Sequence, residues 1–276
     1  MKKSKLAINS VSTRHANLEE ALAAYSAAGF EYVEFVIPTV KEYLATGKTV
    51  SDVRRLLDQY KLKCIGGFET HLCVFSSPAE CAQNHDLHVA NAKLLGELGG
   101  TGMVTGTDGW GMDFSKIEKP IETIAAGFAS VAKRIEGTGV TLLMEFNWSP
   151  IVKSFRTGVE VAKKSKVKNV KVVFDPAHYH CTPSKFEQLT KENVAFVGHV
   201  HVDDMRDIPG ELSNCNSDRV LPGKGCLDLK ALLGAVEKHG YRGFYSIEMF
   251  NEELWAMPAA KAAKLMYKSL LPYCRG

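Results

Sequence analysis

The sequence lacks several features that are typical of particular classes of protein. None of its seven cysteines stands in a C-x-x-C pair, which argues against a zinc ribbon or a thioredoxin-type redox motif. No run approaches the roughly 18 apolar residues of a membrane span, and the opening MKKSKLAINS lacks the apolar segment of a signal peptide. Neither sign of charge is in large excess, because the net charge is +3 and the lysines and arginines are dispersed. We therefore expect a cytoplasmic protein with reduced cysteines and no affinity for membranes or nucleic acid.

What the sequence does contain is material for one large core. Of its 276 residues, 45% are hydrophobic and 24% charged, as in ordinary globular proteins. Short apolar runs alternate with amphipathic segments such as VSDVRRLLDQYK, whose apolar residues fall on one helical face. The predicted strands are residues 5–10, 31–36, 63–69, 101–107, 140–146, 170–175, 195–202 and 243–250.

Eight strands alternating with helices, without a linker, predict a single α/β domain over residues 1–276, a (β/α)₈ TIM barrel. A doubly wound open sheet is the alternative. It is weakened because INSVST, rather than a G-x-G-x-x-G turn, follows the first strand.

Titratable residues recur where the later strands of this predicted barrel end. They are Glu145, Asp175, His201 with Asp203, and Glu248. Barrel enzymes carry their chemistry at the C-terminal ends of the strands, so these side chains should meet at one face. Three carboxylates and an imidazole suit one divalent ion (Mn²⁺, Mg²⁺, Co²⁺ or Zn²⁺), which would also offset their mutual repulsion. His199 shares a strand face with His201, and periodicity does not decide which of them binds metal. A single glutamate at a strand end is more often a solvated or salt-bridged residue, so the prediction rests on all four positions together.

The second half of the chain resembles the sugar isomerase/epimerase superfamily of xylose isomerase-like barrels, and within it the inosose (2-keto-myo-inositol) isomerases. The blocks that carry the resemblance, in family order, are LLMEF, VVFDPAHYH, HVHVDDM, SDRVLPGKGCLDL and YSIEMFNEELW. The resemblance implies one divalent metal. Its ligands would be Glu145, Asp175, His201 and Glu248, with the H-x-x-D pattern selecting His201 over His199.

The same resemblance implies residues that contact the substrate. The D-x-x-H pattern gives His178, and the SDRVLPGKG block gives Arg219. Glu34 and Glu69 stand near the ends of strands two and three, where relatives present polar groups to a sugar. The segments HLCVFSSPAE and TGTDGWGMDF match no motif of the family, so the substrate stays open.

The chemistry implied is isomerisation or epimerisation of a ketose or inosose. Removing a proton next to a carbonyl forms an enediolate, which a divalent ion would stabilise. Glu145 and Glu248 are the predicted catalytic acid–base pair.

Three other functions remain open from the sequence. A metal-dependent lyase, such as a 3-dehydroshikimate dehydratase or a 3-keto-glycoside cleaving enzyme, would use the same proton abstraction. An endonuclease IV-type nuclease would need two further zinc ions, and the sequence offers no D-x-H for a third one. A non-catalytic sugar-binding protein would not need the ligand set. The expected partner is a small sugar or polyol ketone, and the sequence leaves a homo-oligomer possible.

Overall fold

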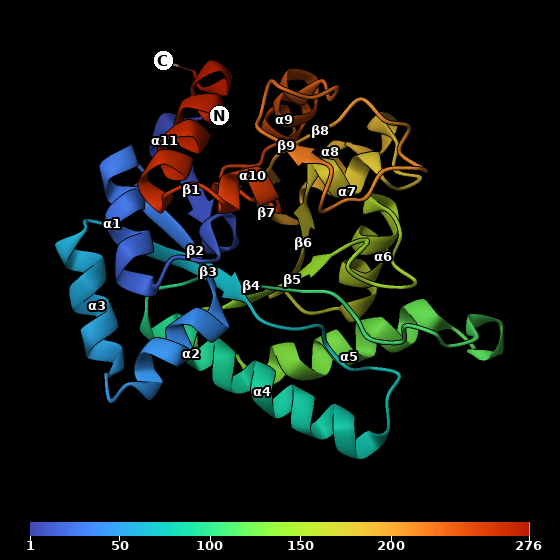
Figure 1. Cartoon of the computed structure of the whole chain (residues 1–276). Coiled ribbons are helices and arrows are strands. Elements are labelled where there is room, and N and C mark those ends of the chain that lie inside the picture. Colours follow the sequence, from blue (N-terminus) through green and yellow to red (C-terminus); the bar gives the residue numbers. More distant parts are fainter. Residues whose placement is uncertain (276) are drawn as a thin grey trace.

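The computed structural model describes residues 1–275, and its centre is a closed barrel of eight parallel strands (Figure 1). Around the barrel the order is β1-β10-β7-β6-β5-β4-β3-β2. The strands are β1 (Leu6–Asn9), β2 (Tyr32–Val36), β3 (Lys63–Phe68), β4 (Gly102–Thr105), β5 (Thr141–Glu145), β6 (Val170–Phe174), β7 (Val197–Val202) and β10 (Tyr245–Ile247). Pairing of β1 with both β2 and β10 closes the sheet. The TIM-barrel prediction is confirmed, and the open-sheet alternative is wrong.

Helices cover the outside of the barrel and follow the strands in the predicted alternation. The outer layer consists of α1 (Leu18–Ala28), α3 (Val50–Gln59), α4 (Pro78–Glu97), α5 (Pro120–Arg134), α6 (Phe155–Ser165), α8 (Lys191–Val194), α9 (Leu229–Lys238) and α11 (Ala259–Leu270). Six of these eight helices start at a side-chain cap. Thr49 of α3 and Ser77 of α4 form capping boxes with Asp52 and Glu80. In the described chain, no helix combines the length and the apolar character that a bilayer span requires.

Shorter elements lie beyond the C-terminal ends of the strands. Helices α2 (Ile37–Ala45), α7 (Pro176–His180) and α10 (Glu252–Trp255) follow β2, β6 and β10, and the antiparallel pair β8 (Asp204–Met205) and β9 (Arg219–Val220) follows β7. The 3₁₀ turns are Lys3–Lys5, Ser10–Thr13, Phe114–Lys116, Phe186–Gln188 and Leu271–Tyr273. Of these elements, α2, α7, α10, the β8–β9 pair and the turns Ser10–Thr13 and Phe114–Lys116 follow strand ends and build the end of the barrel that carries the predicted site.

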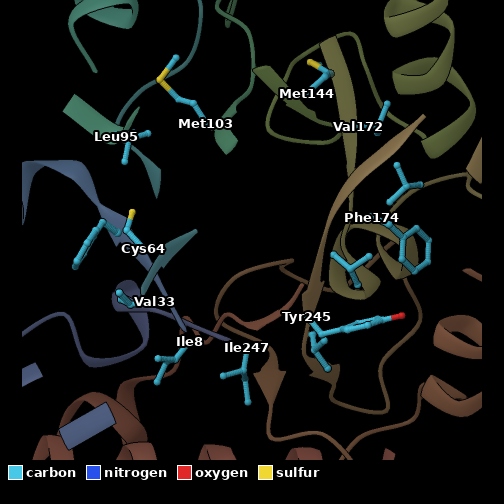
Figure 2. Packing of buried hydrophobic residues seen from close by; sticks show 14 of the residues in the cluster. Ile8, Val33, Cys64, Leu95, Met103, Met144, Val172, Phe174, Tyr245 and Ile247 are labelled. Atoms are coloured by element: carbon cyan, nitrogen blue, oxygen red, sulfur yellow. The ribbon is translucent and has the colours of Figure 1, made fainter. Parts of the chain in front are cut away.

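The apolar core has two parts. A large cluster packs the outward faces of the strands against the helices, and Figure 2 shows Ile8, Val33 and Met144 among its members. A small cluster of Val104, Leu143 and Val173 is separate from it and comes from alternate positions of β4, β5 and β6. These alternate positions point into the barrel, as do Glu145, Asp175 and His201. The inward faces of the strands therefore carry apolar residues in the middle of the barrel and titratable residues at its C-terminal end.

Two glycines allow β3 to approach both of its neighbours, β4 and β2, closely. A Cβ atom on Gly66 of β3 would collide with the backbone carbonyl oxygen of Gly102, and one on Gly67 would collide with that of Phe35. Any larger residue would push the neighbouring strands apart. These two glycines therefore help to set the shape of the barrel beneath the site.

Candidate metal centre

Four of the predicted residues meet at the C-terminal mouth of the barrel. Glu145 ends β5, Asp175 follows β6, His201 lies in β7, and Glu248 follows β10. Each offers one ligand atom, and these atoms all lie within 4.8 Å of one another. All four side chains are buried. The side chains thus form one O/N donor cluster of the kind that holds a divalent ion.

The two ring nitrogens of His201 have different surroundings. Nδ1 faces the cluster and lies 3.0 Å from Glu145 Oε1, 3.3 Å from Asp175 Oδ2 and 3.3 Å from Glu248 Oε2. Nε2 lies on the other side, 3.3 Å from Glu34 Oε2. A carboxylate behind a histidine holds the proton on the far nitrogen and leaves the near one free to bind a metal. Glu34 is placed to do this for His201.

His199 belongs to a second, deeper group. Its Nε2 lies 3.1 Å from Glu34 Oε2, and its ring meets that of His201 edge-on at 5.1 Å between centroids. Glu34, His199 and His201 could also hold an ion, but this group shares His201 with the first. The geometry therefore answers the question that periodicity left open, because His201 and not His199 joins the three carboxylates.

Negative charge in the cluster exceeds what Arg219 balances. Burial raises the pKa of Glu248 to about 8, and the neighbouring Glu145 and Asp175 add to this against the opposing effects of His201 and Arg219. Burial disfavours a charged His201, yet the carboxylates of Glu248 and Glu34 hold its pKa well above the ordinary value. Glu145 Oε1 is buried and has no hydrogen-bond partner among the described residues, although His201 Nδ1 is near it. A buried carboxylate oxygen without a partner is costly, and a cation would satisfy it. The donor set therefore fits a divalent ion.

Arg219 is buried beside the cluster. Its guanidinium donates to Asp203 at 2.6 Å, to Glu248 at 2.8 Å and to Asp175 at 3.1 Å, and it lies over the ring of Phe250. Burial opposes the charge of Asp175, but Arg219 first, and then the nearby histidines, hold its pKa well below the ordinary range. Arg219 thus orients two of the candidate ligands from behind.

The cluster opens into a cavity of about 340 Å³. Its lining combines aromatic rings with a few polar groups: Phe68, Trp110, Glu145, Asn147, Trp148, His178, Cys215, Asn216, Glu248 and Phe250. Small-molecule sites commonly have this composition. Asn9, from β1, donates to Glu248 Oε1 at 2.9 Å and fixes that carboxylate from the other side.

The residues predicted to contact substrate lie at different depths. His178 lines the cavity, and burial lowers its pKa. Arg219, Glu34 and Glu69 are not among the lining residues. Glu69 lies farther out, paired with Lys41 at 2.5 Å and with Asn91 at 2.6 Å. For these three residues, direct contact with a substrate stays a prediction, and the geometry gives Arg219 and Glu34 a positioning role.

Sequence reasoning missed the polar lining residues Asn147, Cys215 and Asn216. They come from the loop after β5 and from the loop between β8 and β9, where no periodicity indicates which way a side chain points. Asn147 follows Glu145 by two residues and has a positive φ of 71°, which is uncommon outside glycine. Its position just after a strand end that was predicted to carry a ligand is the signal that could have found it.

The unassigned loops after β3 and β4 are tied together. The carboxylate of Asp108 accepts hydrogen bonds from the backbone N–H groups of Val74, Phe75 and Ser76 at 2.7–3.1 Å. Gly106 lies so close to the carbonyl oxygen of Trp148 that no Cβ would fit. These contacts fix the loop that carries Trp110, one of the aromatic residues that line the cavity.

Asp204, of the H-x-x-D pattern, has an architectural role. Its side chain accepts hydrogen bonds from the backbone N–H groups of Met205, Gly223, Gly225 and Leu227 at 2.9–3.1 Å. It therefore organises the loop that follows β9, and β9 carries Arg219.

Comparison with known proteins gives both curated relatives and solved structures. The chain is 29% identical over 153 residues to an inosose isomerase of Halalkalibacterium halodurans, which covers 54% of this chain and 52% of that protein. It is 32% identical over 137 residues to an inosose isomerase of Bacillus subtilis, covering 49% of each. An inosose dehydratase of H. halodurans is 22% identical over 155 residues, covering 51% of this chain and 50% of that protein. The chain spans about half the length of the curated relatives it matches.

Solved structures share the fold over almost the whole chain. The IolI protein, solved with a bound zinc atom, aligns with a TM-score of 0.87 at 23% identity, covering 98% of this chain and 97% of that one. An L-ribulose 3-epimerase aligns with a TM-score of 0.77 at 19% identity, covering 99% and 95%. The family model described as xylose isomerase-like TIM barrel matches residues 22–270, about nine-tenths of the chain. The chain therefore belongs to the xylose isomerase-like TIM barrel family.

Proposed function

We propose that the protein is a divalent-metal-dependent isomerase or epimerase of a ketose or inosose. The observation that carries the proposal is the meeting of Glu145, Asp175, His201 and Glu248 at the floor of a cavity walled by aromatic rings. The likeness to inosose isomerases supports the substrate class.

The chain's own residues suit proton transfer next to a carbonyl. Glu145 and Glu248 come from β5 and β10 and both line the cavity, so they can flank a bound substrate. One carboxylate would remove the proton from the carbon, and the other would return a proton to the neighbouring carbon or to the opposite face. A bound divalent ion would supply Lewis-acid stabilisation of the negative charge that develops on the substrate oxygens.

The remaining lining residues would bind and orient the substrate. Phe68 and Trp148 meet edge-on at 5.9 Å between ring centroids and present apolar surface to the carbon face of a sugar or cyclitol. His178 would contact a carbonyl or hydroxyl oxygen. Arg219 would hold the acidic groups in place, and Glu34 would hold His201.

A second candidate function is dehydration on the same site. The match to an inosose dehydratase favours it, because a dehydratase can begin with the same proton removal and then expel a hydroxyl group. A nuclease is disfavoured because, within residues 1–275, the second possible metal group shares His201 with the first.

Solvent-exchange NMR tests the proposal. The metal-loaded protein, prepared with diamagnetic Zn²⁺ or Mg²⁺, would be incubated in D₂O with a panel of ketoses, inososes and dehydroshikimate. Deuterium entry next to the carbonyl with an isomeric product is the expected result. Loss of water would show a dehydratase, and no exchange with any compound by a protein proven to hold metal would overturn the proposal.

A further inference from the structure

Asn147 and Lys153 form a hydrogen-bonded chain that ends on His178. Lys153, in the loop before α6, donates from Nζ to Asn147 Oδ1 at 3.3 Å. Asn147 Nδ2 lies 3.1 Å from Nδ1 of His178, in α7. The three residues come from two neighbouring strand–helix connections, so only the folded barrel brings them together.

The chemistry of these groups fixes the direction of every hydrogen bond. A lysine ammonium has donors and no acceptor, so the atom of Asn147 that faces Lys153 is its carbonyl oxygen. The amide nitrogen must then face His178, and an amide NH₂ only donates. His178 Nδ1 therefore accepts, and a neutral imidazole that accepts at Nδ1 carries its proton on Nε2.

The Nε2 atom is placed to use that proton in the cavity. It lies 3.8 Å from Glu145 Oε1 and 3.9 Å from Asp175 Oδ2, beyond hydrogen-bond distance of either. The donor is therefore not consumed by the candidate ligands. A substrate oxygen in the cavity would find an N–H group beside the carboxylate predicted to move its proton.

The backbone around Asn147 is built to hold this arrangement. Its φ of 71° lies in the left-handed region, and its N–H donates to the carbonyl oxygen of Val152 at 2.7 Å to close the loop. A left-handed residue other than glycine carries a conformational cost that persists only where its surroundings enforce it. Lys153 also lies 4.9 Å from the ring centroid of Trp110, another lining residue, so the chain is part of the cavity wall.

We propose that Asn147, oriented by Lys153, is a positioning residue that holds His178 as the neutral Nε2–H tautomer, ready to donate a hydrogen bond to a carbonyl or hydroxyl oxygen of the substrate. The assignment of the tautomer stands on the structure alone, whereas its use on a ketose or inosose rests on the proposed function.

Nitrogen NMR measures the tautomer directly. The full chain, labelled with ¹⁵N at histidine and loaded with Zn²⁺, would be studied by long-range ¹H–¹⁵N correlation, in which a bare ring nitrogen resonates well downfield of a protonated one. Comparison with His178→Gln identifies the signal of His178 among the nine histidines. We expect a bare Nδ1 and a protonated Nε2. A proton on Nδ1 in the wild-type protein would overturn the inference.

Three variants change the hydrogen bonds between Lys153, Asn147 and His178. Asn147→Asp keeps the size of the side chain but replaces the NH₂ donor by an acceptor, so the proton should move to Nδ1. Lys153→Met frees the amide to turn over and should give a mixture of tautomers, while Lys153→Arg keeps the donor and should preserve the wild-type signal. Asn193→Asp, the same chemical change on α8, is the matched control and should leave the spectrum of His178 unchanged. An unaltered His178 signal in both Asn147→Asp and Lys153→Met would contradict the positioning role.

Kinetics separate this inference from the proposed function. If the enzyme isomerises a compound of the panel, Asn147→Asp should lower kcat at least about tenfold. The double variant with His178→Gln should lose little more than His178→Gln alone, because both changes remove one interaction. Absence of isomerase activity would contradict the proposed function but would not affect the tautomer measured by NMR. Isomerase activity in a protein whose His178 carries its proton on Nδ1 would support the proposed function and contradict the inferred tautomer.

Discussion

The two ends of the barrel carry cavities of opposite character. The C-terminal cavity, of about 340 Å³, has carboxylates at its floor and aromatic rings in its wall. The N-terminal cavity is larger, about 550 Å³, and is lined by five glycines and by basic or histidine side chains such as Lys171, Arg242 and His239. Its lining within the described chain includes no carboxylate. Size alone would have selected the wrong end, whereas convergent titratable groups identify the end where chemistry is possible.

His199 and His201 show that the surroundings of a side chain inside the barrel change within two residues along a strand. The two residues are neighbours on one face of β7, yet His199 lines the N-terminal cavity and His201 lies among the carboxylates of the C-terminal one. Glu34 contacts both. The following predictions test whether the two ends differ in function as they do in composition.

The largest effect is expected from Glu145→Gln or Glu248→Gln. Each change keeps the shape of the side chain and removes the carboxylate that would transfer the proton, so kcat should fall about 10²- to 10⁴-fold. The measurement is turnover of the compound found by solvent exchange, with circular dichroism to show that the fold survives. A rate like that of the wild type in either variant would refute its assigned role.

Removal of metal should abolish activity and lower thermal stability. An ion that binds only the folded protein stabilises it by about 2.7 kcal/mol at a free concentration 100 times its Kd. Thermal unfolding of chelator-treated protein, followed with and without added Zn²⁺ or Mn²⁺, checks this. Asp175→Asn should lose most of the shift, and Asp58→Asn, an exposed aspartate, should keep it. An equal shift in both variants would place the ion elsewhere.

Glu34→Gln should weaken metal binding by about 10- to 100-fold, because it removes the carboxylate that orients His201 from behind. Calorimetric titration with Zn²⁺ gives the affinity. His199→Gln is the matched variant, since it removes the other partner of Glu34 and leaves the contact between Glu34 and His201 in place. A loss in His199→Gln as large as that in Glu34→Gln would place the metal in the deeper group, which contains both residues.

Asp204→Ala should act on stability more than on metal affinity. It strips four backbone N–H groups of their acceptor, and the free energy of unfolding should fall by about 1–3 kcal/mol. Urea denaturation measures the change. Asp204→Asn, which keeps one acceptor oxygen, should be affected less. A drop in metal affinity without a loss of stability would instead make Asp204 part of the site.

The smallest effects are expected at the N-terminal end. Lys171→Met and Arg242→Met should leave kcat within about twofold and unfolding free energy within about 0.5 kcal/mol, as at most surface positions away from special features. A tenfold loss of activity in either variant would show that the two ends are coupled.

The strand–helix alternation could be predicted because it depends on local patterns. Apolar runs and helical periodicity place β5 within the predicted residues 140–146 and β6 within 170–175. The bounds were too generous where strands end early, as at β10, which stops at Ile247 so that Glu248 lies just beyond it. Strand ends are set by hydrogen bonds to neighbouring strands, which one segment of sequence does not contain.

The gathering of Glu145, Asp175 and Glu248 could be anticipated from sequence because parallel strands deliver their ends to one rim. The burial of Arg219 could not, because it follows from the β8–β9 pair and from three carboxylates contributed by distant segments. The hydrogen bonds that link Lys153, Asn147 and His178 could not be predicted either, because they depend on a left-handed residue, Asn147, in an irregular loop.

By itself the sequence determined the barrel and the identity of the acidic rim, because period-two and period-3.6 patterns are local and strand ends share a level in any closed parallel sheet. Only the tertiary structure decided that Arg219 and Glu34 pack against the carboxylates and His201, and which atoms of Lys153, Asn147 and His178 face one another. Those outcomes depend on directions and distances between residues far apart in the chain, and these exist only once the eight strands have closed.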